Sequence, residues 1–387
     1  FERDHAGVSP FFIAGSLFIL AFFSVKGFAP DQSYDTQNYH LLSQIPGFVD
    51  NLHYHVIPGR FQMFGFRLGD RMFYPCRALL GLRMGTLLNA LAMLVIYRQV
   101  TVFLSMEAGR LERTCSWLKH LAPVLAFLIV SRLELIQESG SYMVELLALP
   151  FLLEMVFLLL RGLDEAKWER EAVLFCLFGG ILFCLKMTNI VYLVPLVLLY
   201  LWKIRKYLTP KLFLGCLVTG MIPVSVYLIY NGIAMKNPVY PYYNSLFHSP
   251  YFGEMDFKDP RWGPSNIKEF LLWAYSMIRH PDYRLSELPA KYNLDLALMY
   301  LGAAGAGLCW IWKRVSSRTG TLFLLYAASF ILWAATTGHS RYFMGGILFA
   351  GMLCGCLVLQ GMASISPRLT GGVVFAIMFI VVYAGRA

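Results

Sequence analysis

The chain has 387 residues, of which 58% are hydrophobic and 14% are charged, and its formal net charge is +10. A soluble domain averages about 45–50% apolar and roughly 25% charged residues, so the composition excludes an ordinary soluble protein and predicts a membrane protein. The positive charge does not indicate a nucleic-acid partner, because the basic residues occur in short clusters between apolar segments, as the positive-inside rule describes.

Apolar segments recur along the whole chain, and a spanning helix needs about 20 such residues, or somewhat fewer if flanking side chains snorkel. The sequence therefore predicts an all-α, polytopic transmembrane bundle of about eleven helices. We expect a single transmembrane domain over 1–387, with no separate soluble domain. The predicted spans are 8–26, 78–97, 119–134, 142–160, 172–186, 189–203, 212–230, 293–312, 320–337, 343–361 and 371–385.

The short connectors that carry Lys and Arg are expected in the cytoplasm, because basic residues near helix ends resist translocation. Connectors 161–170 and 203–211 share a side only if the chain between them crosses the membrane twice. These two crossings predict two helices joined by a hairpin turn at 186–189. The extracytoplasmic side then receives long loops after the first and seventh helices, at 27–77 and 231–292.

The loop 231–292 is rich in Pro, Tyr and Trp. Pro restricts the backbone, and Tyr and Trp favour the membrane interface, so we expect an ordered loop on the membrane surface. Apolar residues recur at helical spacing through 265–279, which predicts an interfacial helix.

A polar segment, Ser33-Tyr34-Asp35-Thr36-Gln37-Asn38-Tyr39-His40, follows the first predicted span. A carboxylate just outside the membrane, such as Asp35, can accept the proton of an acceptor hydroxyl. By spacing alone the favoured interpretation is that Asp31 and Asp35 cap a surface helix, which is a common role for Asp.

His53 and His55 alternate along the same loop and precede Arg60. Alternating side chains of an extended segment point to one side and suit a divalent metal, but two ligands do not complete a site. The pair is therefore interpreted mainly as a solvated loop feature, and metal use stays open.

Acidic residues mark the entry to the span 142–160, where Glu138, Tyr142 and Glu145 follow one another at helical spacing and Glu154 lies deeper. Ionisable groups at membrane depth are costly, so they face a cavity or a partner. For Glu138 and Glu145 both a functional and a structural role stay open, and Glu154 favours a structural one.

Two further turns on the predicted extracytoplasmic side carry a cation. Lys186 lies beside Thr188 and Asn189, where it either snorkels to the interface or meets a phosphate. His339-Ser340-Arg341-Tyr342 lies between two apolar segments, where the guanidinium either anchors the chain at the interface or binds a phosphate through two hydrogen bonds.

Taken together, this pattern resembles the GT-C superfamily of integral-membrane glycosyltransferases, which use polyprenyl-phosphate sugars. The resemblance rests on Asp35 just after the first span, on the hairpin lysine in Leu185-Lys186-Met187-Thr188, and on the late turn Ser340-Arg341-Tyr342. The acidic pair that is usual in the first loop of this family is replaced here, because Thr36 follows Asp35. This departure leaves the divalent metal an open question, and no other cofactor is expected.

The resemblance implies inverting transfer of a hexose or pentose at the outer face of a bacterial cytoplasmic membrane. Asp35 would be the general base, and Lys186 and Arg341 would neutralise the leaving polyprenyl phosphate. The acceptor would be a glycan, a lipid or a protein. Residues that would position sugar or acceptor are Tyr39, His40, His55, Arg60, Glu138, Asn189, His339 and Tyr342.

Two other interpretations stay open at the level of sequence. A transporter or a flippase of lipid-linked glycans could use the acidic residues of span 142–160 as proton-relay groups. A glycan ligase or polymerase shares the membrane context and the same residue types.

Overall fold

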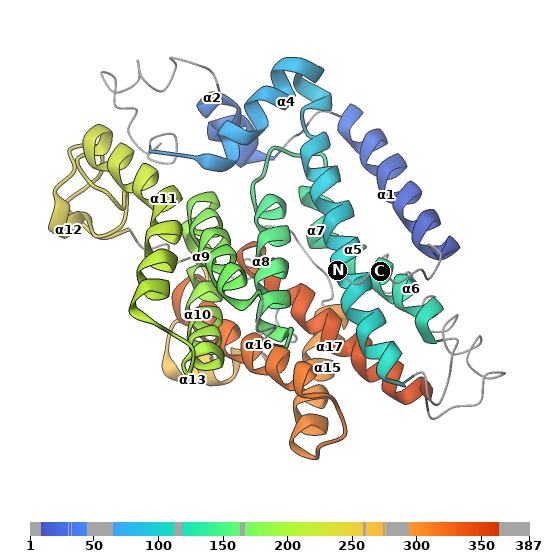
Figure 1. The fold of residues 1–387 in the computed structure, drawn as a ribbon. Helices are drawn as coiled ribbons and strands as arrows, with labels where there is room; N and C mark the ends of the chain where they lie inside the picture. The colour runs from blue at the N-terminus through green and yellow to red at the C-terminus, as the bar shows by residue number, and fades with distance from the viewer. Residues whose placement is uncertain are drawn as a thin grey trace. The chain divides into compact units, whose positions relative to one another are not determined.

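The computed structural model describes residues 9–29, 31, 33–44, 65–111, 118–162, 167–257, 261–273, 275 and 294–363. Within these ranges the regular structure is helical, and no strand occurs. The predicted all-α class is therefore confirmed for the described part of the chain (Figure 1).

The chain divides into two compact units. Unit 1 comprises Phe1–Phe22, Met93–Gln137 and Arg261–Ala387, and unit 2 comprises Phe23–Ala92 and Glu138–Pro260. Three helices continue from one unit into the other along the chain: α1 (Pro10–Phe28), α5 (Leu87–Leu111) and α7 (Leu133–Glu138).

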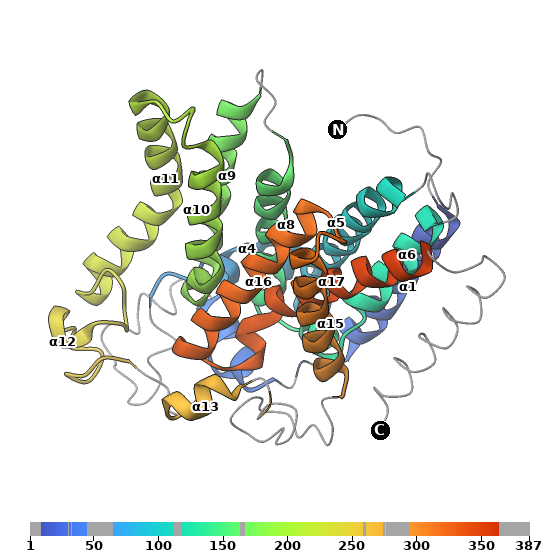
Figure 2. The ribbon, with the colours of Figure 1, turned by 90° about the horizontal axis from the view of Figure 1, so that it is seen from below.

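Unit 1 is built around α17 (Met344–Ala363), which is buried along most of its length. Its neighbours are α6 (Leu118–Val130), α15 (Leu294–Ile311) and α16 (Ser317–Thr336), and Figures 1 and 2 show α15, α16 and α17 side by side. Small residues allow this packing. A Cβ on Gly302 of α15 would lie 2.2 Å from the Cys354 Sγ of α17.

The described part of unit 2 contains five long helices and several shorter segments. The long helices are α4 (Leu68–Met84), α8 (Glu145–Leu160), α9 (Trp168–Leu185), α10 (Ile190–Ile204) and α11 (Pro210–Met235). α9 packs against α8 on one side and α11 on the other, and α9, α10 and α11 lie side by side in Figures 1 and 2. The shorter segments are a π-helical turn (Thr36–His40), α2 (Leu41–Ser43) and α12 (Asn244–Phe247).

Local signals explain where the helices of unit 2 begin and end. The Thr209 side chain accepts a hydrogen bond from Leu212 N at 3.2 Å, and Pro210 occupies the first helical position of α11. Both residues favour a helix start, because the cap pairs an orphan amide and Pro needs no amide partner there. α11 ends where Lys236 adopts a left-handed conformation.

Six described helices have the length and composition to cross a membrane: Pro10–Phe28, Leu87–Leu111, Met187–Ile204, Pro210–Met235, Ser317–Thr336 and Ser340–Ala363. Each overlaps a predicted span, as do α6, α8, α9 and α15. The predicted span 371–385 lies outside the described residues.

The predicted boundary of the second span is wrong. The segment 78–97 is divided between α4, which ends at Met84, and α5, which begins at Leu87. The helical backbone is kinked at Gly81, which has a φ of 83°, and Gly85 lies between the two helices, where a Cβ would come 2.4 Å from the Tyr142 hydroxyl. Apolar composition continues through this break, so hydropathy did not reveal it.

The segment that follows α11 is organised by two fully buried asparagines, Asn237 and Asn244. The Asn244 amide donates to Gly253 O at 2.9 Å and Asn244 Oδ1 accepts from Ser249 N at 2.9 Å, while Asn237 Oδ1 accepts from Val239 N at 2.9 Å. These bonds give residues 237–253 a defined path. Farther along, the predicted interfacial helix 265–279 contains α13 (Ile267–Leu271), and residues 276–279 lie outside the described part.

The contact between α9 and α11 depends on Gly180, where a Cβ would lie 2.2 Å from the carbonyl oxygen of Gly220 and 2.6 Å from Pro223. We expect Gly180→Ala to destabilise the protein by about 1–3 kcal/mol, because a backbone atom must move to make room. Gly215→Ala on α11 is the matched control, since nothing lies within 4 Å of its Cβ position. Thermal unfolding in detergent should show a lower midpoint for the first variant alone, and equal midpoints would contradict this packing.

Candidate functional site

The hairpin predicted at 186–189 is confirmed. α9 ends at Leu185, a 3-10 turn covers Met187–Asn189, and α10 begins at Ile190. The Asn189 amide donates to Leu182 O at 3.0 Å, and the same carbonyl accepts from Lys186 N at 3.4 Å, so the turn is tied to the last turn of α9. The backbone of Lys186 is extended and connects the end of α9 to the 3-10 turn.

Lys186 is paired with Glu145 in the first turn of α8, where Lys186 Nζ donates to Glu145 Oε1. The Glu145 side chain is 7% exposed and that of Lys186 is 21% exposed, so the carboxylate is buried while the lysine side chain is partly exposed. Glu145 and Lys186, both singled out in the sequence, thus form an ion pair with each other. A buried carboxylate at a helix N-terminus is stabilised by the cation and by the helix dipole.

The chain that leads into α8 is held by Asn89 of α5. Its amide donates to Ser141 O at 2.9 Å, to Met143 O at 2.9 Å and to Glu138 O at 3.3 Å. Asn89 is completely buried, so these bonds are sheltered from water. They fix the turn from which Glu145 enters α8.

Replacing Asn89 by Ala is expected to lower the free energy of unfolding by about 2–4 kcal/mol, because it leaves buried carbonyl groups without their donor. Asn89→Asp has the same shape but presents only acceptors to these carbonyls, so we expect a loss at least as large. Chemical denaturation of the purified variants measures both values. An Asn89→Asp protein as stable as the wild type would show that shape, not hydrogen bonding, matters here.

Asp31 connects the first polar segment to the same turn. Its Oδ2 accepts from Tyr142 N at 3.1 Å and its Oδ1 accepts from Ser33 N at 2.9 Å. Asp35 precedes the π-helical turn and makes no side-chain cap bond to it. The interpretation of these two aspartates as helix caps is therefore wrong, because Asp31 joins two loops and Asp35 leaves the turn uncapped. The Asp35 side chain is partly exposed.

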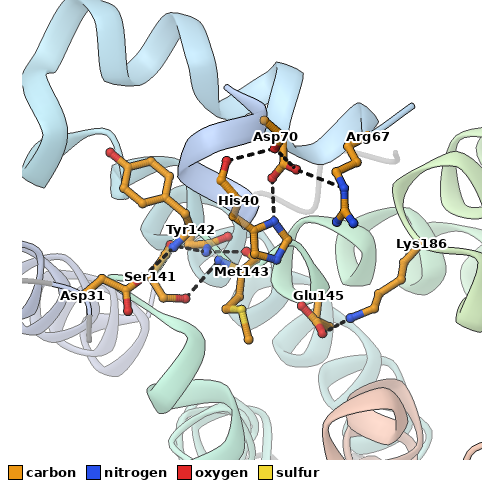
Figure 3. Close-up of polar contacts among 11 residues, drawn as sticks. Asp31, His40, Arg67, Asp70, Ser141, Tyr142, Met143, Glu145 and Lys186 are labelled. Atoms are coloured by element: carbon orange, nitrogen blue, oxygen red, sulfur yellow. Dashed lines mark hydrogen bonds and ion pairs between the residues drawn. The ribbon is translucent and has the colours of Figure 1, made fainter. Parts of the chain in front are cut away.

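The predicted residues Tyr39 and His40 lie beside a cation and a carboxylate that the sequence did not single out. The Arg67 guanidinium carbon is 4.6 Å from the centre of the Tyr39 ring, and His40 Nδ1 is 2.6 Å from Asp70 Oδ1. Figure 3 shows Asp70 above the imidazole, with Arg67 beside it. Asp70 stands in the first turn of α4, a common place for Asp, so its position in the sequence gave no functional signal.

The other acidic residues of the prediction have different surroundings. Glu138 is buried, and its carbonyl oxygen accepts from the Ser141 hydroxyl at 2.6 Å. Glu154 lies 3.7 Å from Arg161 at the far end of α8, which agrees with the structural role favoured for it.

The predicted turn at His339–Tyr342 belongs to unit 1 and is a 3-10 turn. His339 Nδ1 accepts from Arg341 N at 3.1 Å, and the His339 carbonyl accepts from Trp333 Nε1 at 2.8 Å. The Trp262 ring meets the His339 ring edge to face at 4.2 Å. The Arg341 guanidinium carbon is 5.3 Å from the centre of the Tyr342 ring. The turn is thus packed and oriented by its own aromatic neighbours.

His53, His55 and Arg60 lie outside the described residues. Within the described ranges, no three His, Cys, Asp or Glu side chains are placed to hold a metal ion.

No protein-family model and no curated protein matches the chain. Two solved structures do. The crystal structure of ArnT from Cupriavidus metallidurans in the apo state matches with a TM-score of 0.58 and 14% identity, over 96% of this chain and 63% of that one. The crystal structure of the same ArnT bound to undecaprenyl phosphate matches with a TM-score of 0.56 and 15% identity, over 97% and 63%.

The chain thus spans about 63% of the length of the ArnT chains that it matches. At 14–15% identity the likeness concerns the fold, and it agrees with the resemblance that the sequence showed. The described chain therefore shares the fold of the ArnT structures.

Proposed function

We propose that this protein is a membrane glycosyltransferase that moves a sugar from a polyprenyl-phosphate-linked donor to an acceptor hydroxyl. The observation that carries the proposal is the polar cluster of unit 2, in which Asp31, His40, Asp70, Glu145 and Lys186 gather within a GT-C fold (Figure 3). Membrane helices are otherwise poor in such groups, since polar side chains at membrane depth are costly.

Asp35 is the proposed general base. It takes the proton of the acceptor hydroxyl while the acceptor oxygen bonds to the anomeric carbon, and the bond between that carbon and the phosphate oxygen breaks. Attack from the face opposite the phosphate inverts the anomeric carbon. The polyprenyl phosphate leaves with its negative charge. Lys186 stabilises this charge by moving its ammonium group from Glu145 to the phosphate.

The surface of α10 supports a lipid-linked donor. Ile190, Val194, Val197, Leu198 and Leu201 are all exposed and recur at helical spacing, so they form one apolar stripe. The stripe begins four residues after Lys186. An isoprenoid tail on this stripe would therefore bring its phosphate toward the ammonium, and one matching ArnT structure is bound to undecaprenyl phosphate.

The remaining assignments stay predictions of the sequence. They comprise an active site on the extracytoplasmic face of a bacterial cytoplasmic membrane, a role of Arg341 at the phosphate, and positioning roles for Tyr39, His55, Arg60, Glu138, Asn189, His339 and Tyr342. The acceptor is a glycan, lipid or protein hydroxyl.

The proposal is tested with the purified full chain in lipid nanodiscs, supplied with a panel of undecaprenyl-phosphate pentoses and hexoses and a membrane lipid extract as acceptor. We expect release of undecaprenyl phosphate together with a glycosylated product of inverted anomeric configuration. A flippase or transporter would instead move the donor across the bilayer of a proteoliposome with the sugar still attached. Transport without bond cleavage would overturn the proposal.

A further inference from the structure

Asp70 is a carboxylate that the proposed reaction does not use, and it is completely buried. Both of its oxygens are engaged. Oδ1 lies 2.6 Å from His40 Nδ1, and Oδ2 accepts from the Ser43 hydroxyl at 2.6 Å, with Arg67 Nε 4.0 Å away. Burying a carboxylate is costly unless it is hydrogen-bonded or paired, and these three neighbours offset the cost of burying Asp70.

The contact with Asp70 determines which nitrogen of His40 carries the proton. An ionised carboxylate only accepts hydrogen bonds, so Nδ1 is the N–H and donates to Asp70. In the neutral ring, Nε2 is then an acceptor with its lone pair available. Among the described residues, none forms a hydrogen bond with Nε2.

The local backbone also relates His40 to the proposed base. Residues Thr36–His40 form a π-helical turn, in which Leu41 N bonds to Thr36 O, five residues earlier. The wider turn brings positions five apart closer to one face than an α-helix does, and such turns are frequent at functional sites. Asp35 and His40 are five residues apart.

Figure 3 shows what lies near the ring. Asp70 occupies one edge of the imidazole, and the opposite edge faces the side on which Glu145 and Lys186 lie. The Arg67 guanidinium points toward the same side. A substrate whose phosphate contacts Lys186 would therefore present its sugar portion near the free edge of His40.

We propose that His40 Nε2 accepts a hydrogen bond from a sugar hydroxyl of the bound substrate and that Asp70 is the positioning residue that keeps Nε2 in its acceptor form. This inference rests on the proposed function and adds to it a sugar-binding pair, which consists of His40 and Asp70. The hydroxyl belongs either to the donor sugar or to the acceptor. No proton is transferred to His40, so Asp35 remains the base.

A purely structural role must be separated from this one, because Asp70 also ties α2 to α4 through Ser43. Two variants make the separation. His40→Asn keeps an amide that can donate to Asp70 in place of Nδ1–H but has no atom at the position of Nε2. Ser43→Ala removes the other bond of Asp70 and leaves the imidazole intact.

The experiment measures binding and transfer separately in nanodiscs. Affinities for undecaprenyl phosphate and for an undecaprenyl-phosphate sugar are measured without acceptor, and KM for the acceptor is measured under turnover. For His40→Asn we expect a stability near that of the wild type and a two- to tenfold weaker interaction, about the effect of one neutral hydrogen bond. Ser43→Ala should lower stability and leave these constants unchanged.

Each outcome has a distinct meaning. Weaker binding of the sugar-bearing lipid, with unchanged binding of undecaprenyl phosphate, places the hydroxyl on the donor, and a raised KM for the acceptor alone places it on the acceptor. A His40→Asn protein with all constants unchanged, or with equal losses for undecaprenyl phosphate and the sugar-bearing lipid, overturns the pair. A wild type that binds the donor without transferring its sugar refutes the transferase, while the binding measurement still tests His40.

Discussion

Replacing Asp35 by Asn is expected to lower the rate of sugar transfer by about a hundred- to ten-thousand-fold, the usual contribution of a positioned general base. The amide has nearly the same shape but cannot take the proton of the acceptor hydroxyl. Binding of the donor should change little, because the base acts on the acceptor. Single-turnover transfer with a radiolabelled undecaprenyl-phosphate sugar measures the rate, and equilibrium binding of the same lipid measures the affinity.

Asp31→Asn provides the matched control for this prediction, since Asp31 lies four residues earlier and holds backbone amides of Ser33 and Tyr142. An Asn side chain can keep only one of these two bonds, so this variant should lose stability while its folded fraction transfers sugar at less than tenfold reduced rate. A folded Asp35→Asn protein with an unchanged rate would remove Asp35 from the mechanism.

Replacing Lys186 by Met is expected to have two separable effects. The buried carboxylate of Glu145 loses its partner, which should lower the free energy of unfolding by about 3 kcal/mol. The donor phosphate loses a charge-assisted hydrogen bond, which should reduce transfer efficiency by about ten- to a hundredfold.

The double variant Lys186→Met with Glu145→Gln separates these effects. The neutral amide removes the buried charge that Lys186 offset, so stability should return toward that of the wild type. Transfer should stay low, because no cation faces the phosphate. Recovery of transfer together with stability would show that Lys186 serves the fold alone, through its pair with Glu145.

Much of the fold was determined by the sequence itself. Apolar length is a local property, so the helices α1, α10, α11, α16 and α17 follow from counting residues. The hairpin at Lys186 also followed, because basic connectors on both sides require an even number of crossings between them. The approximate position of Asp35 also followed from the sequence, because it depends only on where the first apolar segment ends.

The partners of the polar side chains were decided only by the tertiary structure. His40 and Asp70 are separated by 30 residues, Glu145 and Lys186 by 41, and Asn89 and Ser141 by 52. Hydropathy carries no information on such pairs, since it describes each segment's preference for lipid and not which helix faces meet. Asp70 was overlooked for this reason, because an Asp in the first turn of a helix usually serves the helix dipole, and only burial against His40 and Ser43 gives it another role.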